Sequence, residues 1–160
     1  MSNGPLRPTA AKVREALLEI LKTRLPGCSF LDLYAGVGAV GLEAWEAGAA
    51  RVVLVEKSSV ALRVLRENVR STGATAEVVP KDVVSALRGL AGQNFDIVFL
   101  DPPYGMREIP RALEHVEPVL APEGIVVAEH HHKDPVPESV ARLKRTRVQK
   151  YGETLLSFYS

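Results

Sequence analysis

Three short, predominantly apolar runs constrain the fold of this chain more than any other feature. Residues 30–33, 51–56 and 95–100 read FLDL, RVVLVE and FDIVFL, and they are rich in β-branched and aromatic side chains. Such runs are typical of strands that are covered on both faces, as in parallel sheets. A segment with helical character comes after each run, so we expect an α/β fold with helices on both faces of a mostly parallel sheet.

Further predicted elements continue this alternation. The predicted helices cover residues 8–25, 39–48, 58–70, 83–90 and 107–119. The other predicted strands cover residues 76–80, 124–129, 146–150 and 154–159, the last two as an antiparallel hairpin at one sheet edge. The 160 residues contain no internal repeat and no low-complexity linker, which favours a single domain over residues 1–160.

A glycine-rich turn joins the first apolar run to the next helix. Gly36, Gly38 and Gly41 match the pattern G-x-G-x-x-G, in which glycine lets a ligand approach the backbone at the positive end of a helix. Glu56 ends the next run, 20 residues after Gly36, where a carboxylate can accept both hydroxyls of an adenosine ribose. We therefore expect a cofactor that contains adenosine.

Two acidic residues separate a dinucleotide from S-adenosylmethionine. Asp32 precedes the glycines at the strand end, where its carboxylate can pair with the α-amino group of a methionine tail, whereas a pyrophosphate would gain nothing from it. Asp82 and Val83 follow the third strand, where they can bind the adenine amino group and cover the ring. Alternatively, Asp82 only caps the helix that begins at Val83. S-adenosylmethionine is the predicted cofactor.

The sequence Asp101-Pro102-Pro103-Tyr104 follows the run 95–100 and is the predicted catalytic loop. The exocyclic amine of a nucleic-acid base is a poor nucleophile, because its lone pair is delocalised into the ring. Acceptors at the Asp101 carboxylate and the Pro102 carbonyl would favour the nucleophilic form of the amine and align it with a methyl donor. Tyr104 can stack on the base. The alternative is that the loop is only a stiff turn.

Composition and cysteine content narrow the class of protein. A hydrophobic share of 46% and a net charge of +1 indicate an ordinary globular domain without a uniformly basic surface. Cys28 is the only cysteine, so we expect a packed, unreactive thiol and a reducing compartment. The sequence has no signal-peptide pattern and no apolar run of the roughly 20 residues that a membrane helix needs. We therefore predict a soluble, cytoplasmic protein.

Two polar clusters have competing interpretations. The three consecutive histidines His130–His132 follow a strand, and we interpret them as a polar loop at the mouth of the cleft rather than as metal ligands. No metal is predicted. The chain also has a basic run near its C-terminus, which is either a solvated face or an RNA contact. This run consists of Arg142, Lys144, Arg145, Arg147 and Lys150.

Four motifs together resemble those of the RsmD family, which are bacterial guanine-N2 methyltransferases that act on 16S ribosomal RNA. The motifs are residues 6–9 (LRPT), 13–15 (VRE), 31–38 (LDLYAGVG) and 101–104 (DPPY). The resemblance runs from Leu6 to the final strand. It implies a class I methyltransferase fold with a Rossmann-like sheet of seven strands, the last antiparallel. It also implies that residues 1–25 lie over the active site.

The resemblance and the motifs together assign a role to each site residue. The predicted catalytic residues are Asp101, Pro102, Pro103 and Tyr104. The predicted contacts to S-adenosylmethionine are Asp32, Tyr34, Ala35, Gly36, Gly38, Glu56, Lys57, Asp82 and Val83. The predicted contacts to the substrate are Arg7, Thr9, Arg14 and Tyr104. Ribosomal RNA or the small ribosomal subunit is the predicted partner of a monomeric enzyme.

Other functions remain open at this point. Amino-methylation could act on a DNA base or on a protein glutamine amide, although DNA enzymes typically add a target-recognition region and the glutamine enzymes usually carry Asn at the position of Asp101. An NAD-dependent dehydrogenase would lack a substrate domain and would leave Asp32 unexplained. A degenerate domain that only binds RNA is disfavoured by the intact Asp101 and Glu56.

Overall fold

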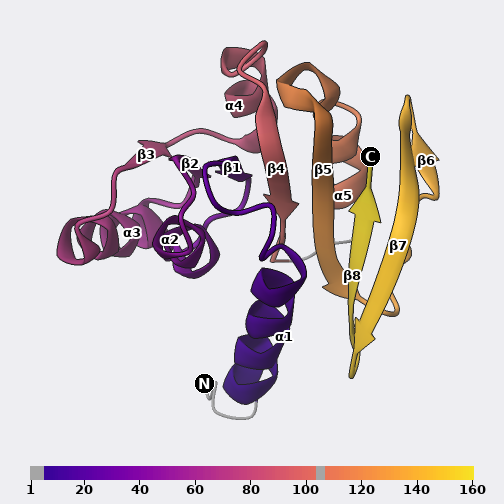
Figure 1. Cartoon of the computed structure of the whole chain (residues 1–160), viewed down its shortest axis with the longest axis horizontal. Coiled ribbons are helices and arrows are strands. Elements are labelled where there is room, and N and C mark those ends of the chain that lie inside the picture. The colour runs from indigo at the N-terminus through magenta and orange to yellow at the C-terminus, as the bar shows by residue number, and fades with distance from the viewer. Residues whose placement is uncertain (1–5, 104–106) are drawn as a thin grey trace.

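The computed structural model describes residues 6–103 and 107–160, with side chains from residue 10 onward in the first range (Figure 1). The helices are α1 (Leu6–Ile20), α2 (Ala39–Glu46), α3 (Ser59–Thr72), α4 (Val83–Gly89), α5 (Glu108–Leu113) and the 3-10 turn η1 (Glu117–Val119). The strands are β1 (Ser29–Asp32), β2 (Arg51–Val55), β3 (Ala76–Val79), β4 (Phe95–Leu100), β5 (Leu120–His131), β6 (Ser139–Val140), β7 (Leu143–Tyr151) and β8 (Thr154–Tyr159).

One mostly parallel sheet organises the chain, with strand order β3-β2-β1-β4-β5-β8-β7-β6. The strands from β3 to β5 pair in parallel, and β8 is antiparallel to both β5 and β7. The expectation of an α/β fold with an antiparallel C-terminal strand is therefore confirmed. The expected number of seven strands is wrong, because the sheet has eight. The additional β6 has only two residues, too few for any periodic pattern to reveal it.

Several predicted elements have different bounds in the structure. The predicted helix 107–119 is divided into α5 and η1, because Pro118 has no amide that could donate to the Glu114 carbonyl and lies instead in the first turn of η1. The predicted strand 124–129 is part of the longer β5. Its pairing with β4 is irregular at the start, where Phe95 pairs with Leu120 and Ile97 pairs with Ile125. The hairpin of β7 and β8 is confirmed, but β8 is an interior strand.

Helices cover both faces of the sheet, and each face has its own hydrophobic core. On one face α4 and α5 pack on the sheet through Val83, Leu87, Ile109 and Leu113. On the other face α1, α2 and α3 pack on it through Leu17, Ala44, Leu65 and their neighbours. Along the parallel strands, the side chains of buried residues point alternately to the two faces of the sheet. These strands therefore contribute to both cores.

The second core contains the cysteine that the sequence predicted to be packed. Cys28 is buried there, and burial raises the pKa of its thiol to about 11, so the thiolate is disfavoured. Trp45 packs against the same core. The first helix ends at Ile20, earlier than expected, but Leu21 and Leu25 remain buried in the turns that follow.

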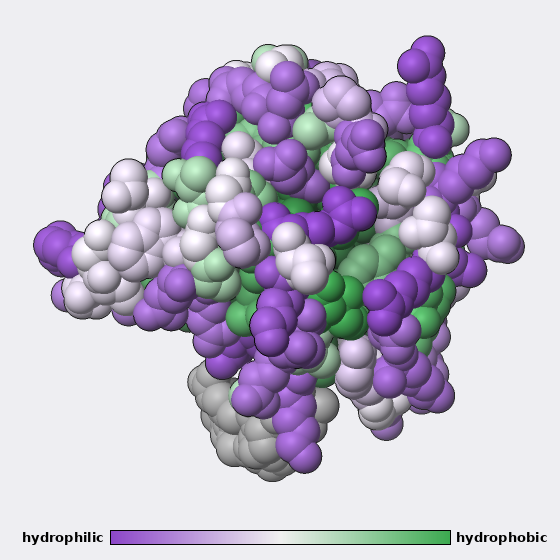
Figure 2. All heavy atoms as spheres, viewed as in Figure 1, coloured by the Kyte–Doolittle hydropathy of each residue, from purple (hydrophilic) through white to green (hydrophobic). Residues whose placement is uncertain are grey.

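Figure 2 views the molecule from the side of α1. Hydrophilic residues dominate this face, and hydrophobic residues are visible over β5 and β8 beside α1. The helix therefore covers only part of the sheet on this side. Within the described residues, the helices are all too short or too polar to cross a bilayer.

Candidate cofactor and active site

A cavity of about 810 Å³ opens at the carboxyl ends of the parallel strands. Its size lies in the range of small-molecule sites, and this end of an open α/β sheet is where such folds bind ligands. Its wall includes most of the predicted cofactor residues. They are Asp32, Tyr34, Ala35, Gly36, Glu56, Lys57, Asp82 and Val83. The sequence prediction therefore brought together residues from three separate segments, which follow β1, β2 and β3.

The three glycines of the turn have different structural roles. Gly36 lies in the cavity wall with a φ of 58°, and a Cβ added there would meet no atom within 4 Å. Gly38 is outside the described part of the wall: a Cβ there would lie 2.6 Å from Leu65 Cδ1. A Cβ on Gly41 would overlap the side chain of Leu54. Only Gly36 therefore exposes backbone to a ligand, whereas Gly38 and Gly41 allow close packing.

The Glu56 carboxylate is fixed between the glycine turn and α3. Its Oε1 accepts a hydrogen bond from the Gly36 amide at 2.8 Å, and its Oε2 accepts one from the Ser58 amide at 2.9 Å. These bonds hold the carboxylate at the edge of the cavity. A ribose could meet it there without rearrangement of the backbone.

Asp82 caps α4 and also lines the cavity. It is the N-cap of α4, because its carboxylate accepts hydrogen bonds from the Ser85 amide at 3.1 Å and the Ser85 hydroxyl at 2.9 Å. These bonds lower the pKa of Asp82. The same residue lines the cavity beside the buried Val83. Capping therefore holds the side chain at the cavity and does not remove it from the wall.

Three carboxyl groups lie together at the floor of the cavity. Asp32 ends β1, and Asp101 and Glu129 lie at the ends of β4 and β5. The register pairs Leu100 with Ala128. The residues that follow them, Asp101 and Glu129, therefore lie side by side. Leu100 and Ala128 belong to the core under α4 and α5, and alternation turns both carboxyl groups toward the α1 side.

Burial raises the pKa of all three carboxyl groups. The pKa of Asp32 rises to about 8 although its carboxylate accepts the Tyr34 amide at 3.1 Å, and the charges of Asp101 and Glu56 raise it further. The pKa of Asp101 rises to about 6. Burial, then the charges of Asp101 and Asp32, raise the pKa of Glu129 to about 8, and Arg14 opposes this shift. The site therefore favours a cationic ligand.

The predicted substrate residues on α1 are only partly described. Arg14 lines the cavity, and its Nε donates to Glu43 Oε2 at 3.0 Å, which ties α1 to α2. Arg7 and Thr9 belong to α1, but their side chains lie outside the described residues. Tyr104 of the predicted catalytic loop also lies outside them, whereas Asp101, Pro102 and Pro103 line the cavity.

Glu108, Arg111 and Glu129 are among the cavity residues to which the sequence assigned no role. The Tyr34 hydroxyl donates to Glu108 Oε1 at 3.1 Å, and Arg111 on the next turn of α5 also lines the cavity. Burial raises the pKa of Tyr34 above its usual value. For Glu129, the sequence signal was its position at the end of the predicted strand 124–129. Only the pairing of this strand with β4, which precedes Asp101, shows that Glu129 belongs to the site.

A second cavity of about 400 Å³ adjoins the first. Four residues line both cavities: Asp101, Pro102, Pro103 and Glu129. The other described residues of its wall are His130, His131, Asp134 and Thr154, from the end of β5, the loop after it and the start of β8. The predicted catalytic loop therefore separates two cavities.

The sequence predicted a loop for the three histidines, and only His132 lies in one. His130 and His131 belong to β5, because β8 pairs with the strand as far as His131. His130 is buried, and its Nε2 is 2.8 Å from Ser157 Oγ while its Nδ1 is 2.9 Å from the Asp134 carbonyl oxygen. Burial lowers the pKa of His130. This side chain therefore fixes the loop after β5 onto β8.

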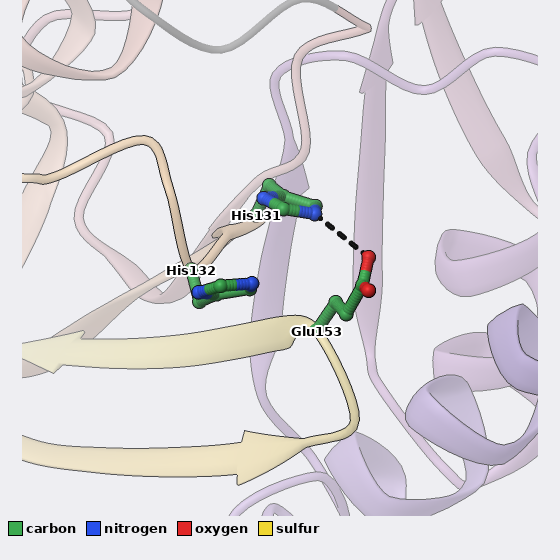
Figure 3. A group of neighbouring side chains, drawn as sticks. All are labelled: His131, His132 and Glu153. Carbon is green, nitrogen blue, oxygen red and sulfur yellow. Dashed lines mark hydrogen bonds and ion pairs between the residues drawn. The ribbon is translucent and has the colours of Figure 1, made fainter.

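His131, His132 and Glu153 form a surface cluster whose ligand atoms lie within 4.8 Å of one another (Figure 3). The two imidazole rings stack with centroids 4.6 Å apart. His131 Nδ1 accepts the Lys133 amide at 3.1 Å, which places the proton on Nε2, and Nε2 donates to Glu153 Oε1 at 3.0 Å. The hydrogen bond from His131 to Glu153 therefore links the end of β5 to the β7–β8 turn.

Comparison with known proteins identifies the family of the chain. Residues 1–160 match the family described as conserved hypothetical protein 95. The chain belongs to this family. Ribosomal RNA small subunit methyltransferase D of Escherichia coli (strain K12) is 32% identical over 157 residues, which cover 96% of this chain and 79% of the relative. A candidate rRNA methyltransferase of Bacillus subtilis (strain 168) is 32% identical over 159 residues, covering 96% and 86%. The resemblance to the RsmD family is confirmed.

Solved structures of relatives confirm the class I methyltransferase fold. A candidate methyltransferase from Escherichia coli superposes with a TM-score of 0.83 at 26% identity, over 92% of this chain and 84% of that chain. A Thermus thermophilus protein without an assigned activity superposes with a TM-score of 0.79 at 34% identity, over 92% and 84%. The family and the fold therefore agree with the motifs.

Proposed function

We propose that this chain is an S-adenosylmethionine-dependent methyltransferase that methylates the N2 amine of a guanine in 16S ribosomal RNA. Its family supports the proposal, as do relatives named for methylation of small-subunit ribosomal RNA. Free ribosomal RNA or the small subunit is the proposed partner. The proposed enzyme is a cytoplasmic monomer.

One observation carries the proposal: Asp101, Pro102 and Pro103 line both cavities. A methyl donor in the larger cavity and a base in the smaller one would meet at this loop. Such an arrangement brings two reactants together at a fixed distance, which is the main contribution that a protein can make to a displacement reaction. Tyr104 is proposed to stack on the base, and Arg7, Thr9 and Arg14 are proposed to contact the RNA.

The residues of the larger cavity fit S-adenosylmethionine. The buried Asp32 carboxyl group suits the α-amino group, the open backbone at Gly36 allows close approach, and Glu56 and Val83 suit the ribose and adenine. Six acidic and four basic side chains line the cavity, in keeping with a positively charged ligand. When bound, this cofactor supplies an electrophilic methyl group on a sulfonium.

Asp101 is proposed to orient the amine and then to receive its proton. Its carboxylate accepts one N2–H bond and the Pro102 carbonyl accepts the other, which directs the nitrogen lone pair at the methyl group. Methyl transfer from the bound cofactor would form the new N–C bond and break the S–C bond, whose electron pair would remain on sulfur. The methylated nitrogen then releases a proton, for which Asp101, with a pKa of about 6, is a competent acceptor.

Transfer of a tritiated methyl group tests this proposal. The substrates are naked 16S ribosomal RNA, assembled small subunits, DNA and protein, and Asp101→Ala is the variant. We expect incorporation into ribosomal RNA at guanine N2, found by nuclease digestion and chromatography of the nucleosides. Loss of the orienting acceptor should lower kcat by at least ~100-fold, as loss of one transition-state hydrogen bond does in other enzymes.

Glu123→Ala is the matched control, because it removes an exposed carboxylate at the far end of β5 and should leave the rate unchanged. Incorporation into DNA or protein alone would contradict the proposed substrate. Full activity of Asp101→Ala would contradict the proposed role of the loop.

A further inference from the structure

Glu129 lies at the junction of the two cavities and has no role in the chemistry described above. It is one of four residues that line both cavities. It lies at the carboxyl end of β5, beside Asp101 at the end of β4. Its position therefore places it against the same part of the substrate that Asp101 contacts.

Strand geometry makes these two carboxyl groups a matched pair. Adjacent strands are about 4.8 Å apart, and residues at the same level on one face have side chains that run alongside each other. Asp101 and Glu129 are at the same level on the α1 face. The site therefore presents two acceptors side by side to whatever enters the smaller cavity.

Guanine presents two donors side by side on its Watson–Crick edge. The N1–H is adjacent to the N2 amine, and both hydrogens point in the same direction. Adenine has a lone pair at N1, which a carboxylate would repel. A substrate that leaves a buried polar group of the site without a hydrogen-bond partner is strongly rejected.

We propose that Glu129 accepts the N1–H of the target guanine while Asp101 accepts its N2–H, which makes Glu129 a specificity-determining residue. The inference rests on the proposed function. The smaller cavity holds the base, and the two carboxyl groups read the pair of donors that distinguishes guanine from adenine.

The surroundings of Glu129 are consistent with this role. Arg14 lies close enough to favour its charged form, and the charges of Asp101 and Asp32 oppose it. A donor from the base and a cation in the larger cavity would both stabilise the carboxylate. The competing explanation is that Glu129 only pairs with Arg14 and holds α1 in place.

The test replaces the target guanine by 2,6-diaminopurine, which keeps the N2 amine but has a lone pair at N1. The base is introduced by ligation at the nucleotide that the methyl-transfer assay identifies. We expect wild type to prefer guanine over 2,6-diaminopurine by about tenfold or more in kcat/KM, in line with one hydrogen-bond mismatch. In Glu129→Gln the amide can either accept from N1–H or donate to N1, so the preference should fall by about tenfold.

For each variant, the ratio of kcat/KM for guanine to kcat/KM for 2,6-diaminopurine separates recognition from structural damage. Structural damage would lower both values together and leave the ratio unchanged. Glu123→Gln is the control and should keep the wild-type ratio. An unchanged ratio in Glu129→Gln, or no preference in wild type, would overturn the inference. Failure of wild type to methylate any guanine would instead overturn the proposed function, so the two failures are distinguishable.

Discussion

At the scale of single residues, three buried carboxyl groups make the larger cavity suited to a cationic ligand. They are Asp32, Asp101 and Glu129. Each carboxyl group is held where burial disfavours its charged form, and the charge of Asp101 raises the pKa of both Asp32 and Glu129. Bringing three such groups together costs stability in the empty protein. A positively charged ligand would recover that cost, which is the pattern expected of a binding site.

The first prediction at this scale concerns protons. With a pKa of about 8, Asp32 is mostly protonated at pH 7 in the empty protein, and pairing with an ammonium group requires the carboxylate. Binding of S-adenosylmethionine should therefore release protons at pH 7, and its affinity should rise as pH increases toward 8. Calorimetry in buffers of different ionisation enthalpy measures the number of protons released.

Asp32→Asn removes this titrating group. We expect the variant to release fewer protons at pH 7 and to bind S-adenosylmethionine roughly tenfold to a hundredfold more weakly, because the amide leaves the ammonium group without a charged partner. Glu123→Gln should behave as wild type. The same proton release in Asp32→Asn and wild type would show that Asp32 does not pair with the cofactor.

At the scale of elements, the position of α2 depends on the absence of a side chain at Gly41. The helix begins at the glycine turn, and its first residues, Ala39 and Val40, line the larger cavity. Gly41 faces Leu54 on β2 so closely that a Cβ would overlap it. The third glycine of the pattern thus sets the distance between helix and sheet.

Gly41→Ala should therefore force α2 away from β2. We expect it to lower the free energy of unfolding by about 1–3 kcal/mol, as overpacking does, and to weaken cofactor binding. Gly89→Ala is the matched control: Gly89 ends α4, and a Cβ there meets no atom within 4 Å. Its effect should be neutral or stabilising by up to about 1 kcal/mol. Urea unfolding compares the two, and equal effects would contradict this account of the packing.

At the scale of the whole molecule, the site joins both cores. The larger cavity takes residues from the strands β1 and β5 and from α1 and α4, two helices that pack on opposite faces of the sheet. A ligand in it should therefore stabilise the described fold as a unit. Local unfolding of one face would remove part of the site.

S-adenosylmethionine at about 100 times its Kd should stabilise the protein by about 2.7 kcal/mol. For a chain of this size, that corresponds to a rise in Tm of roughly 5–10 °C in a single transition. Differential scanning calorimetry measures it, with NAD at the same concentration as the control that should leave Tm unchanged. A rise with NAD alone would favour the dehydrogenase, and separate transitions for the two cores would contradict a single cooperative unit.

The sequence alone identified the alternation of strands and helices, the glycine turn and the acidic residues at the strand ends. These are local signals: apolar runs such as 95–100 report burial on both faces, and Asp32, Glu56 and Asp82 follow strands at fixed distances from their motifs. It could not reveal the two-residue β6 or the extended start of β5. Those depend on pairing with neighbouring strands rather than on any periodic pattern.

Tertiary structure alone decided which of these residues face one another. The register of β4 and β5 brings Glu129 beside Asp101, and the pairing of β5 with β8 turns His130 inward. Leu65 lies against Gly38 and Leu54 lies against Gly41, and both of these neighbours come from other parts of the chain. A motif specifies its own backbone, whereas the partner across the sheet is fixed only when distant strands come together.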